Sequence, residues 1–384
     1  MRIVHIADTH LGLSGFNRVD PETGMNLREK LVYDNFLESI DVIIGERPDV
    51  LVHAGDLFDR VKPKTRAYTV VLDALDRLDG AGIPLVIVAG NHSMPKTRYT
   101  PSPFEVLSYH PSGINAAYGF RYEHVEIGDA VFHLIPNLLS PGHYREEYDR
   151  IEPDRSSLNI LVTHGLASTI SDRRLKTVAE HELDSTILSS DFDYIALGHF
   201  HDQVQVTDNA WYSGSIEYCT YNEIRDTKGG LVFDSCTSEV SHLSLPNTPM
   251  IDLGIVQCSG LSVPEITERV NGKLDRTPYP DGRGPTLLML TLREISTEDL
   301  RAVNPRSCMK GRDNILDLKV KAETSDEFRP LSPERDLRSM DFAEEFESFI
   351  EKKQLSKRES AFVSAKGAEV LKKAVSTHGG GTAE

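Results

Sequence analysis

The chain has 384 residues, and its 42 Lys and Arg residues are outnumbered by 59 Asp and Glu residues, which gives a formal net charge of −17. At about 150 residues per domain this length predicts two or three domains, and a hydrophobic content of 39% excludes wholesale disorder. The charge excludes a protein that binds nucleic acid through general positive charge alone, but it allows a local basic surface or a metal-bridged phosphate site.

Short apolar runs rich in Val, Ile and Leu recur through the first half of the chain and have the length of buried strands. These runs are Arg2–Ala7, Asp49–Ala54, Ile83–Ala89, Val131–Pro136, Leu158–Thr163 and Asp193–Leu197, with LVFDSC after Gly230 as one of the last. Helical patterns lie between the early runs, at Leu27–Ile44 and Thr65–Leu78. Strands that alternate with helices predict a layered α/β domain, which we place at residues 1–240.

The stretch 245–325 has a different pattern and predicts a small α+β domain. We expect strands in IDLGIVQ, TLLMLTLRE and NILDLKVKAE and helices in PEITERVNGKLDR and TEDLRAV. Residues 326–338 are polar with two prolines, which is typical of a linker.

Residues 339–375 predict two short amphipathic helices, with Phe342, Phe346 and Phe349 on the apolar stripe of the first and Phe362 on that of the second. Isolated helices of this length are marginal in water, so their apolar faces need a partner protein or the parent domain. The Gly-rich residues 376–384 are expected to be a disordered tail.

Signals for the cellular compartment are few. The four cysteines are far apart with no C-x-x-C pair, so neither a zinc knuckle nor a disulfide framework fits. The opening residues MRIVHIAD predict a strand rather than a signal peptide. No apolar run approaches the length of about 20 residues that spans a bilayer. We therefore expect a cytoplasmic protein with no membrane association.

Polar groups follow five of the predicted strands directly. They are Asp8 and His10, His53 and Asp56, Asn91 and His92, then His164, and finally His199 and His201. Because ligand sites in open α/β sheets lie at the carboxyl ends of strands, we expect these groups at one edge of the sheet. Imidazole with carboxylate suits Mn²⁺, Fe²⁺ or Zn²⁺, and one carboxylate can bridge two ions. Neighbouring glycines are expected to allow the sharp turns that aim the ligands.

A histidine beside a strand is usually structural, so eight of the fourteen histidines receive no role. These are His5, His110, His124, His133, His143, His181, His242 and His378. For the seven metal-ligand candidates a structural interpretation requires chance to place all of them at strand ends in a consistent order.

In order along the chain, the motifs D-x-H, G-D, G-N-H, H and G-H-x-H resemble the pattern of the calcineurin-like metallophosphoesterase superfamily. ADTHLG at 7–12, HAGDLFD at 53–59 and GNHSMP at 90–95 resemble its SbcD branch, the nuclease subunits of a DNA double-strand-break repair complex. The resemblance implies an α/β fold: a layered β-sandwich flanked by helices, with a small α+β capping domain and a C-terminal helix pair.

The resemblance also implies two Mn²⁺ ions per chain. Asp8, His10, Asp56 and His201 would hold the first ion, and Asp56, Asn91, His164 and His199 the second, with Asp56 bridging. His92 would stabilise the transition state or protonate the leaving oxygen. His53 matches a position linked to nuclease action, although a role in orienting a ligand is nearly as strong an interpretation. The sequence departs from the family at Ser93, where an acid commonly helps to orient the histidine.

The implied activity is Mn²⁺-dependent 3′→5′ exonuclease action on duplex DNA and endonuclease action on single strands. A homodimer through Leu27–Ile44 and Thr65–Leu78 is implied, unless the core uses both apolar faces fully. An SbcC-type coiled-coil ATPase partner would bind Phe342, Phe346, Phe349 and Phe362, unless these side chains pack on the parent chain. No G-x-x-x-x-G-K-[ST] loop is present, so this chain alone should not hydrolyse ATP.

Basic residues follow three of the strand ends and are candidates for DNA phosphate contacts. They are Arg60, Lys62, Lys64 and Arg66, then Lys96 and Arg98, then Arg173, Arg174 and Lys176. The alternative is a solvated charged surface. Two rival functions stay open. The first is a metallophosphatase or small-molecule phosphodiesterase of the same fold, since GDLFDR resembles a phosphatase motif. The second is a non-catalytic scaffold, which predicts missing metal ligands, whereas all the ligand residues are present in this sequence.

Overall fold

The computed structural model describes residues 1–95, 97, 99–138, 140–168, 170, 182–183, 187–188, 191–280, 284–324, 363–364 and 366–367. The chain divides into two compact units, Met1–Ser325 and Asp326–Glu384. The predicted linker at 326–338 and tail at 376–384 lie outside the described residues. So does the segment 339–375, apart from helical residues at 363–364 and 366–367.

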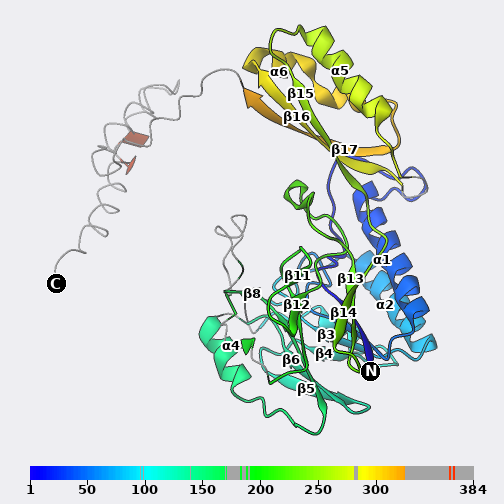
Figure 1. Cartoon of the computed structure of the whole chain (residues 1–384), viewed down its shortest axis with the longest axis vertical. Coiled ribbons are helices and arrows are strands. Elements are labelled where there is room, and N and C mark those ends of the chain that lie inside the picture. The colour runs from blue at the N-terminus through cyan, green and yellow to red at the C-terminus, as the bar shows by residue number, and fades with distance from the viewer. Residues whose placement is uncertain are drawn as a thin grey trace, which may run out of the picture. The chain divides into compact units, whose positions relative to one another are not determined.

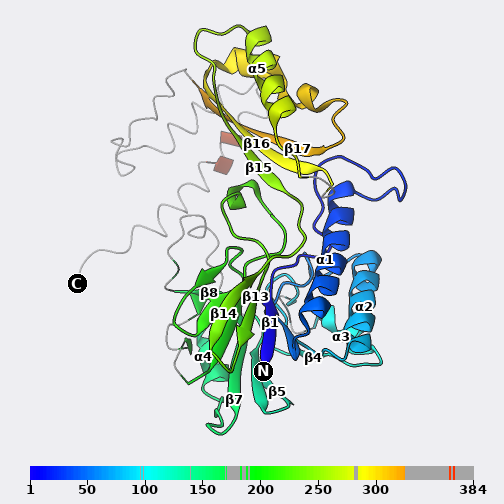
Figure 2. The ribbon, with the colours of Figure 1, turned by 45° about the vertical axis from the view of Figure 1, so that its right-hand side comes forward.

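The first sheet has six strands in the order β14-β13-β1-β2-β3-β4. They are β1 (Arg2–Ile6), β2 (Val50–His53), β3 (Leu85–Val88), β4 (Asn115–Ala117), β13 (Gly230–Asp234) and β14 (Glu239–Leu243). Strands β1 to β4 run parallel, whereas β13 and β14 pair antiparallel. Helices α1 (Leu27–Glu46), α2 (Thr65–Gly80) and α3 (Phe104–Leu107) cover one face of this sheet (Figures 1 and 2).

The second sheet also has six strands, in the order β11-β12-β10-β7-β6-β5. They are β5 (Glu123–Ile127), β6 (Ala130–Ile135), β7 (Leu158–His164), β10 (Tyr194–Gly198), β11 (Val204–Gln205) and β12 (Ala210–Tyr212). Helix α4 (Pro141–Tyr148) packs on its outer face through Tyr144. A short pair, β8 (Leu166–Ala167) and β9 (Glu182–Leu183), and the 3-10 turn η2 (Tyr221–Glu223) complete this part.

Alternating side chains explain why the two sheets pack face to face. In β1, Ile3 lies in the core between the sheets, whereas Val4 and Ile6 lie in the core beneath α1 and α2. The second sheet contributes Phe132 and Ile160 to the shared core. The layered β-sandwich flanked by helices is therefore confirmed.

The expectation that all five ligand-bearing strands end at one edge of a single sheet is wrong. Strands β1, β2 and β3 belong to the first sheet, and β7 and β10 belong to the second. Their carboxyl ends still meet, because both parallel sets end on the same side of the sandwich, as the contacts between the ligands described below require. Pairing between strands far apart in sequence decides which strand joins which sheet, and the local apolar patterns do not predict that pairing.

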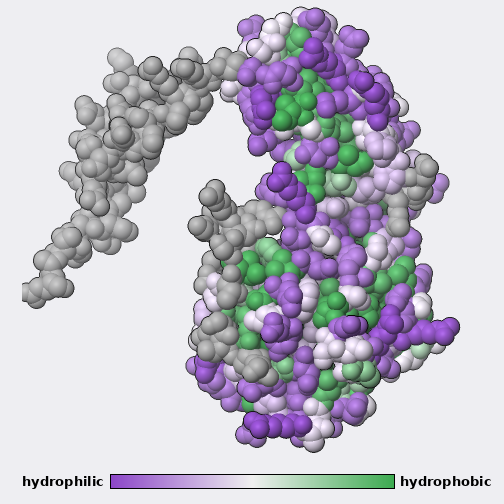
Figure 3. Space-filling model, in the orientation of Figure 1, coloured by the Kyte–Doolittle hydropathy of each residue, from purple (hydrophilic) through white to green (hydrophobic). Residues whose placement is uncertain are grey.

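The third sheet is small and parallel. Its strands are β15 (Met250–Gln257), β16 (Thr286–Ile295) and β17 (Ile315–Thr324), and it carries α5 (Val263–Arg276), α6 (Thr297–Val303) and the 3-10 turn η3 (Pro305–Met309). These elements match the three strands and two helices predicted for this stretch, and they have a core of their own around Val270 and Leu290. Figure 3 shows apolar residues at the surface over β15, where Ile255 is 44% exposed.

Strand β14 continues to Leu243, so the first sheet extends past the boundary predicted at residue 240. We retain the division into domains at 1–240 and 245–325 as a proposal. Among the described residues, no helix combines the length and the apolar composition that crossing a bilayer requires.

Candidate metal centre

The chain turns sharply at the strand ends, and the ligand candidates themselves occupy the unusual conformations. Asp8, His10, Asp56 and His199 have φ values of 52°, 45°, 52° and 101°. Such left-handed conformations are rare for residues with side chains and cluster at functional sites.

The neighbouring glycines mainly provide space. A Cβ atom on Gly90 would lie 2.3 Å from Asp56 Oδ1, and one on Gly198 would lie 2.0 Å from the carbonyl oxygen of Ala54. Among Gly55, Gly90 and Gly198, only Gly55 has a positive φ, at +104°. The expected role of glycine in turning the chain is therefore only part of the explanation.

The first group of ligands comes from the ends of β1 and β2. Ligand atoms of Asp8, His10 and Asp56 lie within 4.8 Å of one another, and all three residues are buried. His201, after β10, joins them, since its Nε2 lies 3.2 Å from His10 Nε2. The backbone N–H of His199 donates to Asp8 Oδ2 at 2.9 Å and fixes that carboxylate.

The second group combines both sheets. Ligand atoms of Asp56, His164 and His199 lie within 4.8 Å of one another. Asn91 Oδ1 lies 2.9 Å from His164 Nε2 and 3.1 Å from His199 Nδ1. Asp56 belongs to both groups, which is the position that a bridging carboxylate requires.

The hydrogen bonding of these side chains fits bound cations. His164 Nδ1 must donate to the carbonyl oxygen of Ala54, at 2.8 Å, so in the neutral ring Nε2 presents a lone pair. That lone pair faces two oxygens, Asn91 Oδ1 and, at 3.3 Å, Asp56 Oδ2. Acceptors this close repel one another unless a proton or a cation lies among them. The residues therefore fit bound divalent ions, and the assignment of each ligand to one of two ions stays a prediction.

A histidine must be neutral to act as a ligand, and the four histidine candidates differ in this respect. Burial is outweighed by Asp56, which raises the pKa of His164, and by Cys219 and Glu223, which raise the pKa of His201, whereas the pKa values of the other two are lowered. Burial, followed by the nearby His164, lowers the pKa of His199 to about 3. Burial likewise lowers the pKa of His10 well below its usual value. Burial alone would raise the pKa of Asp56, but the imidazoles of His164 and His10 outweigh it and lower that pKa, so the carboxylate is ionised.

His92 lies beside the first group, with its ring 4.8 Å from that of His10. Its Nδ1 lies 2.8 Å from the carbonyl oxygen of Asp59 and therefore donates to it, which leaves Nε2 free. Ser93 does not take the place of the acid common in the family, since its buried hydroxyl has no hydrogen-bond partner. A carboxylate oxygen of Asp59 lies within 4.8 Å of ring nitrogens of His10 and His92, so Asp59 supplies an acid near His92 instead.

His53 lies behind the ligands. Thr9 Oγ1 donates to the carbonyl oxygen of Leu57 at 3.1 Å, so it accepts from His53 Nε2 at 3.0 Å. Burial lowers the pKa of His53 to about 3, which keeps it neutral. Since Thr9 lies between Asp8 and His10, these contacts favour the interpretation that His53 orients the ligand loop.

The predicted DNA contacts are only partly within the described residues. Arg60, Lys62, Lys64 and Arg66 are all exposed. Arg60 pairs with Asp59 at 3.2 Å, and Lys64 pairs with Glu29 at 2.5 Å. The remaining candidates lie outside the described residues, as do all four predicted partner contacts. These are Lys96, Arg98, Arg173, Arg174, Lys176, Phe342, Phe346, Phe349 and Phe362.

Sequence reasoning missed three residues of this site. Asp59 stands in the quoted HAGDLFD motif, three residues after Asp56, and this spacing was the available signal. Cys219 forms a close group with His10 and His201, and Glu223 Oε1 lies 3.1 Å from His201 Nδ1. Cys219 lies in irregular chain after β12 and Glu223 lies in η2, and neither segment has a periodic sequence pattern.

Together, a helix-flanked β-sandwich and a double group of Asp, Asn and His ligands define a metallophosphoesterase. The family profile described as "Calcineurin-like phosphoesterase" matches residues 1–203, more than half of the chain, and the chain belongs to this family.

Curated relatives share the name "DNA double-strand break repair protein Mre11". The chain is 29% identical to the protein from Methanococcus maripaludis over 238 residues, 59% of this chain and 60% of that one. It is 32% identical to the Sulfurisphaera tokodaii protein over 201 residues, 52% of this chain and 49% of that one. The chain thus spans half to three-fifths of the length of these relatives. A solved purple acid phosphatase, PPD1 from yellow lupin, is similar at 14% identity and a TM-score of 0.38, over 63% of this chain and 52% of that one.

Proposed function

We propose that this chain is an SbcD-type nuclease that uses two Mn²⁺ ions to process DNA ends in double-strand-break repair. Its activities would be 3′→5′ exonuclease action on duplex DNA and endonuclease action on single strands. The observation that carries the proposal is the double group of ligands that shares Asp56. The similarity to proteins named for DNA double-strand break repair supports DNA as the substrate.

Two divalent ions, when bound, would neutralise phosphate charge and activate water at neutral pH. Asp8, His10, Asp56 and His201 would hold the first ion, and Asp56, Asn91, His164 and His199 would hold the second. His92 would act as a general acid in its imidazolium form: Nδ1–H stays hydrogen-bonded to the backbone carbonyl oxygen of Asp59, and Nε2–H gives its proton to the leaving oxygen, which leaves a neutral imidazole. His53 would keep the loop of Asp8 and His10 in place through Thr9.

The test is digestion of end-labelled duplex DNA with and without Mn²⁺, reading product length and end chemistry. We expect stepwise shortening from the 3′ end in the wild type and none in Asp56→Ala, because Asp56 belongs to both ligand groups. His92→Ala should lose about 100-fold to 10,000-fold in rate, the usual contribution of a general acid. Full activity in His92→Ala would remove it from the chemistry, and an inactive wild type would refute the nuclease.

A metallophosphatase or small-molecule phosphodiesterase of the same fold is the second candidate. The third sheet favours DNA, because a small substrate does not need an additional 75-residue α+β region at 250–324. Parallel assays on DNA, a phosphopeptide and bis-p-nitrophenyl phosphate distinguish the two. Preference for the phosphopeptide would favour the phosphatase.

The proposed assembly is a homodimer bound to an SbcC-type coiled-coil ATPase. Helices α1 and α2 are the dimer candidates, since Leu37, Tyr68 and Leu72 pack on the core while remaining only partly buried. The C-terminal segment 339–375 is the candidate for the ATPase.

A further inference from the structure

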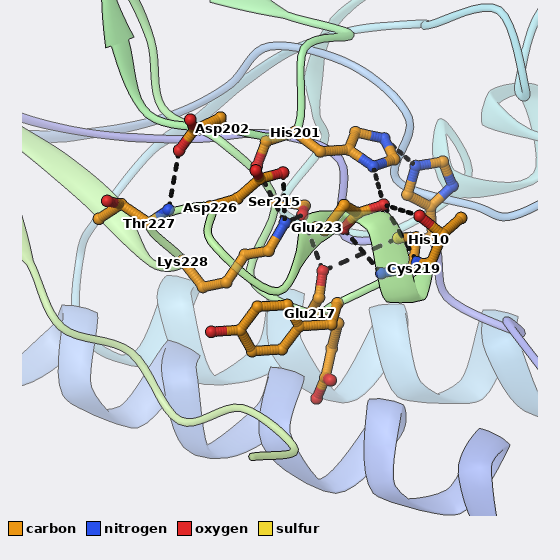
Figure 4. A network of polar contacts seen from close by, with 12 residues as sticks. His10, His201, Asp202, Ser215, Glu217, Cys219, Glu223, Asp226, Thr227 and Lys228 are labelled. Atoms are coloured by element: carbon orange, nitrogen blue, oxygen red, sulfur yellow. Dashed lines mark hydrogen bonds and ion pairs between the residues drawn. The ribbon is translucent and has the colours of Figure 1, made fainter. Parts of the chain in front are cut away.

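Glu223 is a buried acid that touches the ligand His201 without belonging to the predicted ligand set. It ends the turn η2, and its Oε1 lies 3.1 Å from His201 Nδ1. Figure 4 shows its carboxylate pointing at the His201 ring, with the His10 ring on the other side. A carboxylate can only accept at this nitrogen, so the contact places the proton on Nδ1 and leaves Nε2 free for a metal ion.

Lys228 binds the other oxygen of the Glu223 carboxylate. Its Nζ is buried and lies 2.7 Å from Glu223 Oε2, 3.0 Å from the carbonyl oxygen of His201 and 2.8 Å from Ser215 Oγ (Figure 4). Asp226 lies further away, at 3.8 Å. One ion pair therefore holds His201 at both its ring and its backbone.

We propose that Glu223 and Lys228 are positioning residues that orient His201 for the first metal ion. The inference deepens the proposed function, since it assigns residues that support the first of its two ion sites. The His201 ring can rotate about its side-chain bonds, whereas the sandwich core fixes the strand before it. The Glu223–Lys228 pair supplies the missing constraint, and the second ion site does not depend on it.

The same loop contains a matched control. Glu217 is also buried and ion-paired, with its Oε2 2.8 Å from Arg28 Nη1. Its other contacts are Asn35 on α1, at 2.5 Å, and Thr248 before β15. Glu217 thus resembles Glu223 in burial and pairing, but its side-chain contacts are with structural residues and not with a metal ligand.

The experiment is titration of the full-length, metal-free protein with Mn²⁺ by calorimetry, which needs no DNA. His201→Ala and Asn91→Ala identify the binding steps of the first and second ions. We expect Glu223→Gln to weaken the first step by about 10-fold to 100-fold, the usual effect of a residue that orients a ligand, and to leave the second step unchanged. Glu217→Gln should lower the melting temperature but keep both steps.

Hydrolysis of bis-p-nitrophenyl phosphate gives the second readout. In Glu223→Gln, the Mn²⁺ concentration for half-maximal rate should rise by the same factor, with the rate recovering at saturating Mn²⁺. If the wild type binds Mn²⁺ but does not cleave DNA, the proposed nuclease function is refuted, whereas the positioning role of Glu223 and Lys228 is not affected. A Glu223→Gln protein that titrates like wild type, or that weakens both steps equally, would overturn it.

A buried lysine left without its partner can prevent folding. The double variant Glu223→Gln/Lys228→Met removes both charges and keeps the test valid. It should show the same selective loss of the first step, and normal binding of both ions would overturn the proposal.

Discussion

Four of the metal-ligand candidates adopt left-handed backbone conformations, so the site stores strain that the surrounding fold must sustain. Such conformations cost of order 1–3 kcal/mol each. Backbone hydrogen bonds between the loops help to sustain these conformations: Asp8 N–H donates to Gly55 O and His10 N–H to Asp56 O, both at 3.0 Å. The loops after β1 and β2 are thus held together, and a change that displaces Asp56, which belongs to both ligand groups, should affect both ion sites.

Gly90→Ala tests this coupling. Its new methyl group would meet Asp56 Oδ1 at 2.3 Å and the ring of His164 at 2.7 Å, so the bridging carboxylate must move. We expect loss of about 100-fold in the hydrolysis rate of bis-p-nitrophenyl phosphate, as for displacement of a reacting group by about 1 Å.

The control is Gly45→Ala in α1, where a Cβ has no heavy atom within 4 Å. That substitution should keep full activity and stabilise the helix by up to about 1 kcal/mol in chemical denaturation. If Gly90→Ala keeps the wild-type hydrolysis rate, the added methyl group does not displace the Asp56 carboxylate, and the expected coupling is wrong.

Residues of the site were predictable where a strand leads directly to them. Asp8, Asp56 and His164 follow buried apolar runs, and the common direction of parallel strands brings them together. Glu223 was not predictable, because its approach to His201 depends on the path of irregular chain between β12 and β13. The hydrogen bond from His92 to the backbone of Asp59 was not predictable either, because it depends on the paths of the loops that carry the two residues.

At the scale of elements, the start of α2 carries charges that do not help the helix. Lys64 is the N-cap residue without a side-chain cap bond, Arg66 lies in the first turn, and that turn has no acidic residue. Cations at a helix N-terminus are destabilising by about 0.3–1 kcal/mol each. Because this loop follows Asp56, the proposed role in holding DNA phosphates explains why basic residues stand there.

The variant Lys62→Gln/Lys64→Gln/Arg66→Gln should therefore bind DNA more weakly than the wild type, with a lower melting temperature because the buried carboxylate of Glu29 loses its ion-pair partner Lys64. For each phosphate that the variant no longer neutralises, the slope of log affinity against log salt should fall by about 0.9, and binding should weaken equally across DNA sequences. Fluorescence anisotropy at several salt concentrations measures both effects.

A matched variant removes three positive charges from the amino ends of the parallel strands: Arg2→Gln/Arg47→Gln/Arg77→Gln. Arg2 begins β1, Arg47 is the C-cap residue after α1 and Arg77 lies in the last turn of α2. It should bind DNA like the wild type. Equal weakening in both variants would mean that the effect is one of net charge alone.

The elements themselves were more predictable than their assembly. The expected helix at Leu27–Ile44 is observed as Leu27–Glu46, and the expected strand at Leu158–Thr163 as Leu158–His164. Apolar spacing fixes such segments locally. The assignment of strands to the two sheets of the sandwich was missed, because it follows from non-local pairings such as β1 with β13, more than 200 residues apart. Short strands such as β4 and β11 have too few residues for a pattern.

At the scale of the whole molecule, a net charge of −17 opposes DNA binding over most of the surface. Binding would then depend on the two metal ions and the basic loop before α2, with the ATPase supplying further affinity. Residues 1–325 form a compact unit that contains both ligand groups and helices α1 and α2. Catalysis and dimerisation should thus be separable from partner binding.

A chain that ends at Arg338, lacking residues 339–384, tests this separation. It should bind two Mn²⁺ ions, hydrolyse bis-p-nitrophenyl phosphate at the wild-type rate and sediment as a dimer, because the proposed groups for all three lie before residue 325. It should fail to co-purify with the ATPase, since Phe342, Phe346, Phe349 and Phe362 are absent. Retained co-purification would place the ATPase contact on residues 1–338, and a monomeric product in both chains would refute dimerisation through α1 and α2.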